Sequence, residues 1–181
     1  MHIRQAILHA LAVGALLLSS SLHADWRTVV PDAQLVGVGE FRFFGLAVYQ
    51  ARFWSADSAL ERPLDMDSPF ALELTYRRAI SRDDLVDASI KEIRRLANTP
   101  LDPEVLARWQ QEMALAFVDV RAGERITGVF LPGEGAQFYV AEVLQHSVPG
   151  EAFARAFFSI WLDERTRNPR LRAQLLGAKQ R

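Results

Sequence analysis

Residues 34–54 form an apolar and aromatic run in which side chains alternate at the two-residue period of a β-strand. Between Phe41 and Trp54 both alternate faces are largely apolar. A strand with two apolar faces is typical of the centre of a sheet that is covered on both sides. We therefore predict strands over residues 34–54, with residues 41–54 as a central strand bent at Gly45.

The rest of the chain alternates between strand-like and helix-like segments. Ser81 and Asp102-Pro103 are local start signals for helices. The expected order is a strand over 70–76, helices beginning near 81 and 102, strands over 125–131, 136–140 and 143–144, and helices over 149–162 and 168–177. This order predicts an α+β fold: an open-faced antiparallel sheet with helices packed mainly on one side.

The first 24 residues have the composition of a secretory signal peptide. Arg4 precedes an apolar run, and Leu22-His23-Ala24 fits a small-residue cleavage site. The apolar run is too short to span a membrane, and no longer run follows. We therefore expect cleavage near Ala24, one domain over residues 25–181, and a periplasmic or secreted mature protein without a transmembrane segment.

Cysteine and histidine usage excludes several kinds of site. The chain has no cysteine, and three of its four histidines lie in the first 24 residues, which leaves His146. A zinc site of histidine and thiolate ligands cannot be built from this set, and we expect neither a metal nor a cofactor. The net charge of −1 gives no indication of nucleic-acid binding.

One segment places polar groups among aromatic residues. Arg42 and Tyr49 flank an apolar stretch, and an arginine in an apolar cleft binds a carboxylate or an enolate oxygen well. A regular strand would put these two residues on opposite faces, whereas a bulge at Gly45 would bring them together. The alternative is that Arg42 reaches the solvent at the rim while Tyr49 belongs to the core.

Several segments in order resemble the bacterial, exported branch of the chalcone isomerase-like proteins. They are residues 36–39, 43–54, 70–76, 119–125, 128–133 and 153–163, which together extend over nearly all of the chain after residue 24. The resemblance implies an open-faced antiparallel sheet backed by helices, with a ligand cleft between the two layers.

The resemblance also indicates which active-site groups this chain lacks. Plant members cyclise chalcones with the help of an arginine and a threonine, and Phe44 stands where the threonine is expected. Residues 34–41 contain no arginine, and Arg42 is the nearest one. The tyrosine and asparagine of the helical wall are replaced around 84–85 and 91–92.

Plastid relatives bind fatty acids through an arginine and a tyrosine on the carboxylate. In this chain that resemblance makes Arg42, Phe44, Tyr49, Tyr76 and Arg77 the candidate ligand-binding residues.

Three functions remain open after this comparison. The first is an exported, non-catalytic protein that binds a small amphipathic ligand such as a fatty acid. The second is an isomerase or intramolecular lyase that acts on an enone. The third is a module that docks another envelope protein through an apolar surface.

Overall fold

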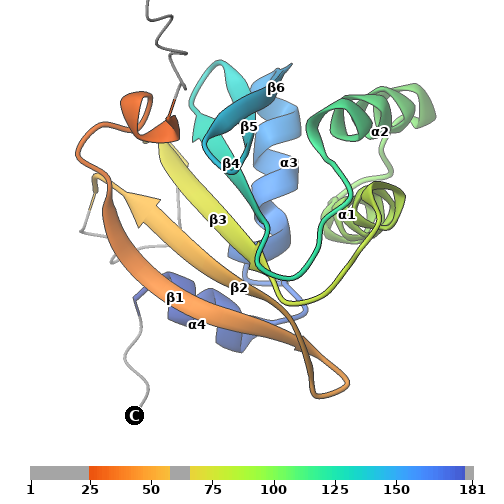
Figure 1. The fold of residues 1–181 in the computed structure, drawn as a ribbon. Coiled ribbons are helices and arrows are strands. Elements are labelled where there is room, and N and C mark those ends of the chain that lie inside the picture. Colours follow the sequence, from red (N-terminus) through yellow and green to blue (C-terminus); the bar gives the residue numbers. More distant parts are fainter. Residues whose placement is uncertain (1–24, 58–65, 178–181) are drawn as a thin grey trace, which may run out of the picture.

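The computed structural model describes residues 25–57 and 66–177, so the expected signal peptide lies outside the described residues. Six strands form one antiparallel sheet in which each strand pairs with its neighbour in the chain (Figure 1). The strands are β1 (Gln34–Phe43), β2 (Leu46–Ser55), β3 (Phe70–Tyr76), β4 (Arg125–Leu131), β5 (Gly135–Val140) and β6 (Val143–Pro149). The helices are η1 (Trp26–Thr28), α1 (Arg82–Leu96), α2 (Pro103–Ala116), α3 (Glu151–Leu162) and α4 (Pro169–Leu175). The predicted α+β class is confirmed.

The prediction of one bent central strand over residues 41–54 is wrong. The chain reverses at Phe44 and Gly45, whose φ angles of 48° and 79° form a two-residue turn between β1 and β2. Two positive φ angles are typical of a type I′ hairpin turn, which usually has Asn-Gly at these positions. Because Phe44 stands where asparagine is usual, the sequence does not indicate the turn. The turn projects beyond the rest of the sheet (Figure 1).

The main core lies between the sheet and the helices. Alternate β3 residues Phe70, Leu72, Leu74 and Tyr76 are buried in this core, which also contains Phe153, Phe157 and Phe158 of α3. Helices α1, α2 and α3 lie on the same side of the sheet (Figure 1).

Local capping signals set where the helices begin. The side chains of Ser81, Asp102 and Asn168 each accept a hydrogen bond from a backbone N–H in the first turn of α1, α2 and α4. These bonds satisfy donors that a helix start leaves unpaired. The starts of α1 and α2 agree with the sequence prediction. Strand β6 extends to Pro149, beyond the predicted strand over 143–144.

Helix α4 approaches β1 closely because two glycines lie beneath it. A Cβ atom at Gly37 would lie 2.0 Å from the carbonyl oxygen of Gln174. At Gly39 it would lie 2.5 Å from a methyl carbon of Leu171. These are therefore strand glycines that permit close helix packing.

The opposite face of the sheet has its own small core. Helix η1 contributes Trp26, which packs with Val30, Ala71, Val129 and Tyr139. Beside this core the carboxylate of Glu73 is buried and pairs with Arg52 at 3.2 Å and Arg125 at 3.6 Å.

Among the helices of residues 25–57 and 66–177, none is both long and apolar enough to cross a bilayer.

Candidate functional site

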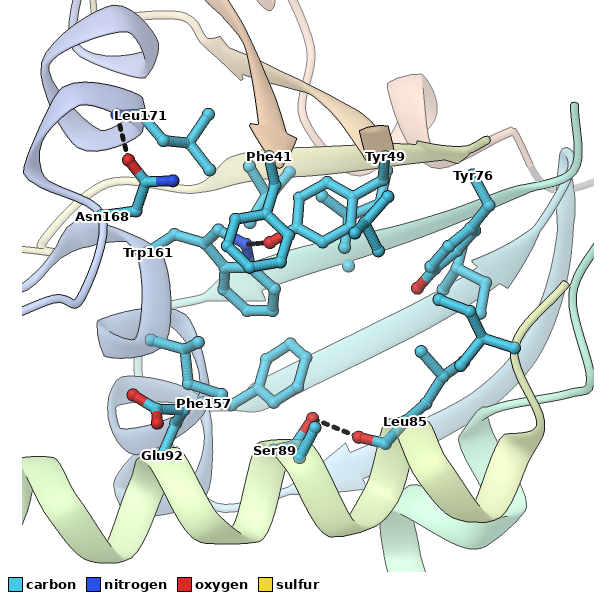
Figure 2. A pocket seen from close by; sticks show the side chains of 18 of the residues that line it. Phe41, Tyr49, Tyr76, Leu85, Ser89, Glu92, Phe157, Trp161, Asn168 and Leu171 are labelled. Atoms are coloured by element: carbon cyan, nitrogen blue, oxygen red, sulfur yellow. Dashed lines mark hydrogen bonds between the residues drawn. The ribbon is translucent and has the colours of Figure 1, made fainter. Parts of the chain in front are cut away.

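A cavity of about 420 Å³ lies between the sheet and helices α1 and α3. Its walls are mostly aromatic and aliphatic side chains, and its size and apolar character are those of a small-molecule site. Figure 2 shows α1 below the cavity, α3 beside it, and Leu171 of α4 at its upper edge. The apolar lining includes Phe41, Leu72, Leu74, Leu85, Phe117, Ile126, Phe138, Phe157, Phe158, Ile160, Trp161 and Leu171.

Tyr49 of β2 is held in place at the sheet side of this cavity. Its ring stacks on Phe41 of β1 with 5.1 Å between centroids, because these residues are direct partners in the strand pairing. The indole Nε1–H of Trp161 donates a hydrogen bond of 2.9 Å to the Tyr49 hydroxyl oxygen. Burial raises the pKa of Tyr49 well above its ordinary value, although the Trp161 bond opposes the shift. The phenol therefore stays protonated.

Tyr76 ends β3 directly opposite Tyr49 in the sheet. The two rings meet edge to face with 6.0 Å between centroids, and Tyr76 is only 3% exposed. Its hydroxyl points into the cavity toward α1 (Figure 2). Burial and the neighbouring Tyr49 raise its pKa well above the ordinary value. No residue of the described part of the chain forms a hydrogen bond with this hydroxyl.

The other neutral polar groups of the wall are partly occupied by the fold. The Ser89 hydroxyl donates to the Leu85 carbonyl oxygen at 2.8 Å, and the Thr166 hydroxyl donates to that of Ile160, also at 2.8 Å. Asn168 uses its side-chain oxygen as the α4 cap, which leaves its amide nitrogen at the cavity wall (Figure 2).

Charged residues lie at the edge of the cavity. Glu92 accepts hydrogen bonds from Arg95 at 2.8 Å and from Arg167 at 2.6 Å, which links α1 to the segment before α4. The Arg167 side chain is 61% exposed. Asp84 and Lys91 also border the cavity and are exposed on α1. The mouth thus carries charges of both signs.

The structure brings together two of the five predicted ligand-binding residues, Tyr49 and Tyr76. Arg42, Phe44 and Arg77 lie outside the cavity lining. Arg42 pairs with Glu40 at 2.7 Å and donates to the Gly45 carbonyl oxygen at 3.0 Å, both near the hairpin turn. Phe44 is 90% exposed in that turn, and Arg77 lies 3.9 Å from Glu40.

The pairing register explains why Arg42 and Tyr49 are apart. Tyr49 is opposite Phe41, and an irregularity between Phe41 and Arg42 pairs Arg42 with Ala47 instead. The expected bulge at Gly45 is a turn, so it does not bring Arg42 to the tyrosine.

Sequence reasoning missed Trp161 as part of the site. The spacing of Phe153, Phe157, Ile160 and Trp161 indicated one apolar helix stripe, which identifies core-facing residues but not the cavity that they border.

Over the ranges 25–57 and 66–177, no three His, Cys, Asp or Glu residues lie close enough together to hold a metal ion. His146 lies on β6, where its Nε2 is 2.6 Å from a carboxylate oxygen of Glu112.

Comparison with known proteins agrees with this architecture. A solved structure of an Arabidopsis thaliana fatty-acid binding protein superposes with a TM-score of 0.62 at 14% sequence identity. The match covers 81% of this chain and 88% of that one, and at this identity it shows a shared fold alone. No curated protein sequence matches. The model of the chalcone isomerase-like family matches residues 25–177, and the chain therefore belongs to the chalcone isomerase-like family.

Proposed function

We propose that this protein binds one small amphipathic molecule without transforming it, and that the apolar part of the ligand fills the cavity between the sheet and α1 and α3. The observation that carries the proposal is the cavity of about 420 Å³, whose aromatic and aliphatic lining contains few polar groups. Transfer of an apolar chain from water into such a space is favourable in proportion to the apolar area removed from water.

The titratable groups around the cavity favour binding over catalysis. General acid–base catalysis needs a group whose pKa lies near the working pH. In the part of the chain that the structure describes, the two phenols in the wall have pKa values raised well above their ordinary range. At the mouth, Glu92 is engaged by two arginines.

Fatty acids are the first ligand class to examine. The solved structure that shares this fold is described as a fatty-acid binding protein, and a flexible alkyl chain suits an apolar cavity of this size. The apolar chain is the part of such a ligand that the cavity wall would contact.

Blocking the cavity tests the proposal independently of the ligand's polar group. Ser89 lines the cavity from α1, so Ser89→Trp would place an indole ring in the space. Nile red, an uncharged apolar dye, should bind the unmodified protein and bind Ser89→Trp at least about tenfold more weakly, since the filled space leaves no room for the dye. Fluorescence titration measures both affinities.

Ala107→Trp is the matched control, because Ala107 is exposed on α2 and does not border the cavity. This variant should bind the dye as the unmodified protein does. Equal dye binding by Ser89→Trp and Ala107→Trp, or no binding by any of the three proteins, would reject the cavity as a ligand site.

We also propose that the protein acts outside the cytoplasm after cleavage near Ala24. The composition of residues 1–24 supports this, and the family match begins at residue 25. Mass spectrometry of the protein from its own host should give a chain that begins at Asp25. A chain that retains Met1 or His2 in that host would contradict export by cleavage.

A further inference from the structure

The polar groups that face the inside of the cavity are uncharged. Within the described residues, the only charged side chains that line it are Asp84, Lys91, Glu92 and Arg167. Asp84, Lys91 and Arg167 are exposed at the mouth, and Glu92 is held by Arg95 and Arg167. The charges of the four lining residues sum to zero.

Tyr76 presents a hydrogen-bond donor inside the cavity. The side chain is almost completely buried, its hydroxyl points into the space, and no described residue accepts its proton. Because the hydroxyl borders the cavity and forms no hydrogen bond with a described residue, a ligand that carries an acceptor can complete its hydrogen bond.

Tyr49 is a second uncharged hydrogen-bond donor in the cavity wall. Its oxygen already accepts the indole N–H of Trp161, so its own O–H remains available as a donor. The Asn168 amide nitrogen adds another uncharged donor at the wall. The cavity therefore offers neutral donors, and the cations that line it lie at its mouth.

We propose that the polar group of the ligand is an uncharged oxygen acceptor, such as a ketone or ester carbonyl, that accepts a hydrogen bond from the Tyr76 hydroxyl. This inference rests on the proposed function and specifies the chemistry of its ligand. An ionised carboxylate beside Tyr76 would lose its hydration and meet no cation there, because Lys91 and Arg167 lie at the mouth. A carbonyl at the same place loses less and gains the Tyr76 bond. A fatty acid whose head group reaches Tyr76 would therefore be protonated.

The effect of the head-group charge can be measured at constant ligand size with 2-undecanone and decanoic acid, which have equal numbers of non-hydrogen atoms. At about pH 8, where the acid is ionised, the ketone should bind at least about tenfold more tightly. As the pH falls toward about 5, the affinity for the acid should rise by up to about tenfold per pH unit, because the neutral form increases by that factor. The affinity for the ketone should stay constant. Equilibrium binding by native mass spectrometry measures both ligands.

Tyr76→Phe tests the assigned donor. It should weaken ketone binding by about two- to tenfold, the ordinary range for a neutral hydrogen bond. Tyr139→Phe is the matched control, because Tyr139 lies on the other face of the sheet with its hydroxyl bonded to Gln137. Its ketone affinity should equal that of the unmodified protein.

The outcomes separate this inference from the proposed function. Tighter binding of decanoate than of the ketone at about pH 8, or no loss of ketone affinity in Tyr76→Phe, overturns the neutral acceptor while Nile red binding still supports the cavity. Failure of Nile red and both ligands to bind overturns the proposed function and the inference with it.

Discussion

Phe44 occupies a backbone conformation that is unusual for its residue type. Its φ of 48° lies in the left-handed region, where the Cβ atom of an L-residue is crowded. The side chain is 90% exposed, so burial contributes little to offset this strain, and its ring contact is with Phe43, which is 59% exposed. The free-energy cost of the left-handed backbone conformation is therefore confined to Phe44.

Phe44→Asn should therefore stabilise the protein. Asparagine tolerates the left-handed region, and Asn-Gly is the preferred sequence of a type I′ turn. We expect the free energy of unfolding to rise by about 0.5–1 kcal/mol in urea denaturation.

Phe43→Asn serves as the comparison, because Phe43 precedes the turn and its φ is not positive. It should give no stabilisation. If Phe44→Asn is destabilising, the exposed ring contributes more to the hairpin than the backbone strain costs.

At the scale of elements, helix α4 and strand β1 fit together because β1 has glycines at two positions that the helix approaches closely. The helix carries Leu171 to the cavity wall, so the packing of α4 on β1 also sets one boundary of the ligand space. Two glycines in one strand thus influence a site to which neither contributes a side chain.

Gly37→Ala should disturb this contact. The added methyl group would lie 2.0 Å and 2.4 Å from the carbonyl oxygens of Gln174 and Leu175, so α4 must move. We expect a loss of about 1–3 kcal/mol in the free energy of unfolding, together with weaker Nile red binding.

Val38→Ala is a suitable control in the same strand, because Val38 is 38% exposed. It should change stability by about 0.5 kcal/mol or less. Equal stability and equal dye binding in Gly37→Ala and the unmodified protein would mean that α4 can shift without affecting the cavity.

Sequence reasoning succeeded where the determining interactions are local. The starts of α1 and α2 follow from Ser81 and Asp102, whose caps involve residues within three positions of each other. It failed at the β1–β2 turn, because Phe44 carries none of the usual turn chemistry. The cavity could not be predicted from the sequence either, because Tyr49 and Trp161 are 112 positions apart and come together only in the folded chain.

At the scale of the whole molecule, all three tyrosines of the chain lie in environments that disfavour the phenolate. Tyr49 and Tyr76 face the cavity, and Tyr139 lies in the small core on the other face. Burial raises the pKa of each of them. The native protein therefore keeps tyrosine protons that the unfolded chain releases near pH 10.

The stability of the protein should fall as the pH rises above about 10. In that range the native state binds more protons than the unfolded state, so the free energy of unfolding decreases with pH. The slope is up to about 1.4 kcal/mol per pH unit for a phenol as buried as Tyr76.

Urea denaturation at alkaline pH measures this slope, and tyrosinate absorbance reports ionisation in the native state. Tyr76→Phe should have a shallower slope than the unmodified protein. Native tyrosines that ionise at their ordinary pKa would contradict the effect of burial.

The pairing of every strand with its neighbour in the chain has a consequence for biosynthesis. A meander of this kind can assemble progressively from its N-terminal end, because each strand pairs with the strand that precedes it in the chain. The cavity cannot, because its walls need Trp161 from α3 and Leu171 from α4. The sheet can therefore exist before there is any place for a ligand, and loading must follow the arrival of the last two helices that the structure describes.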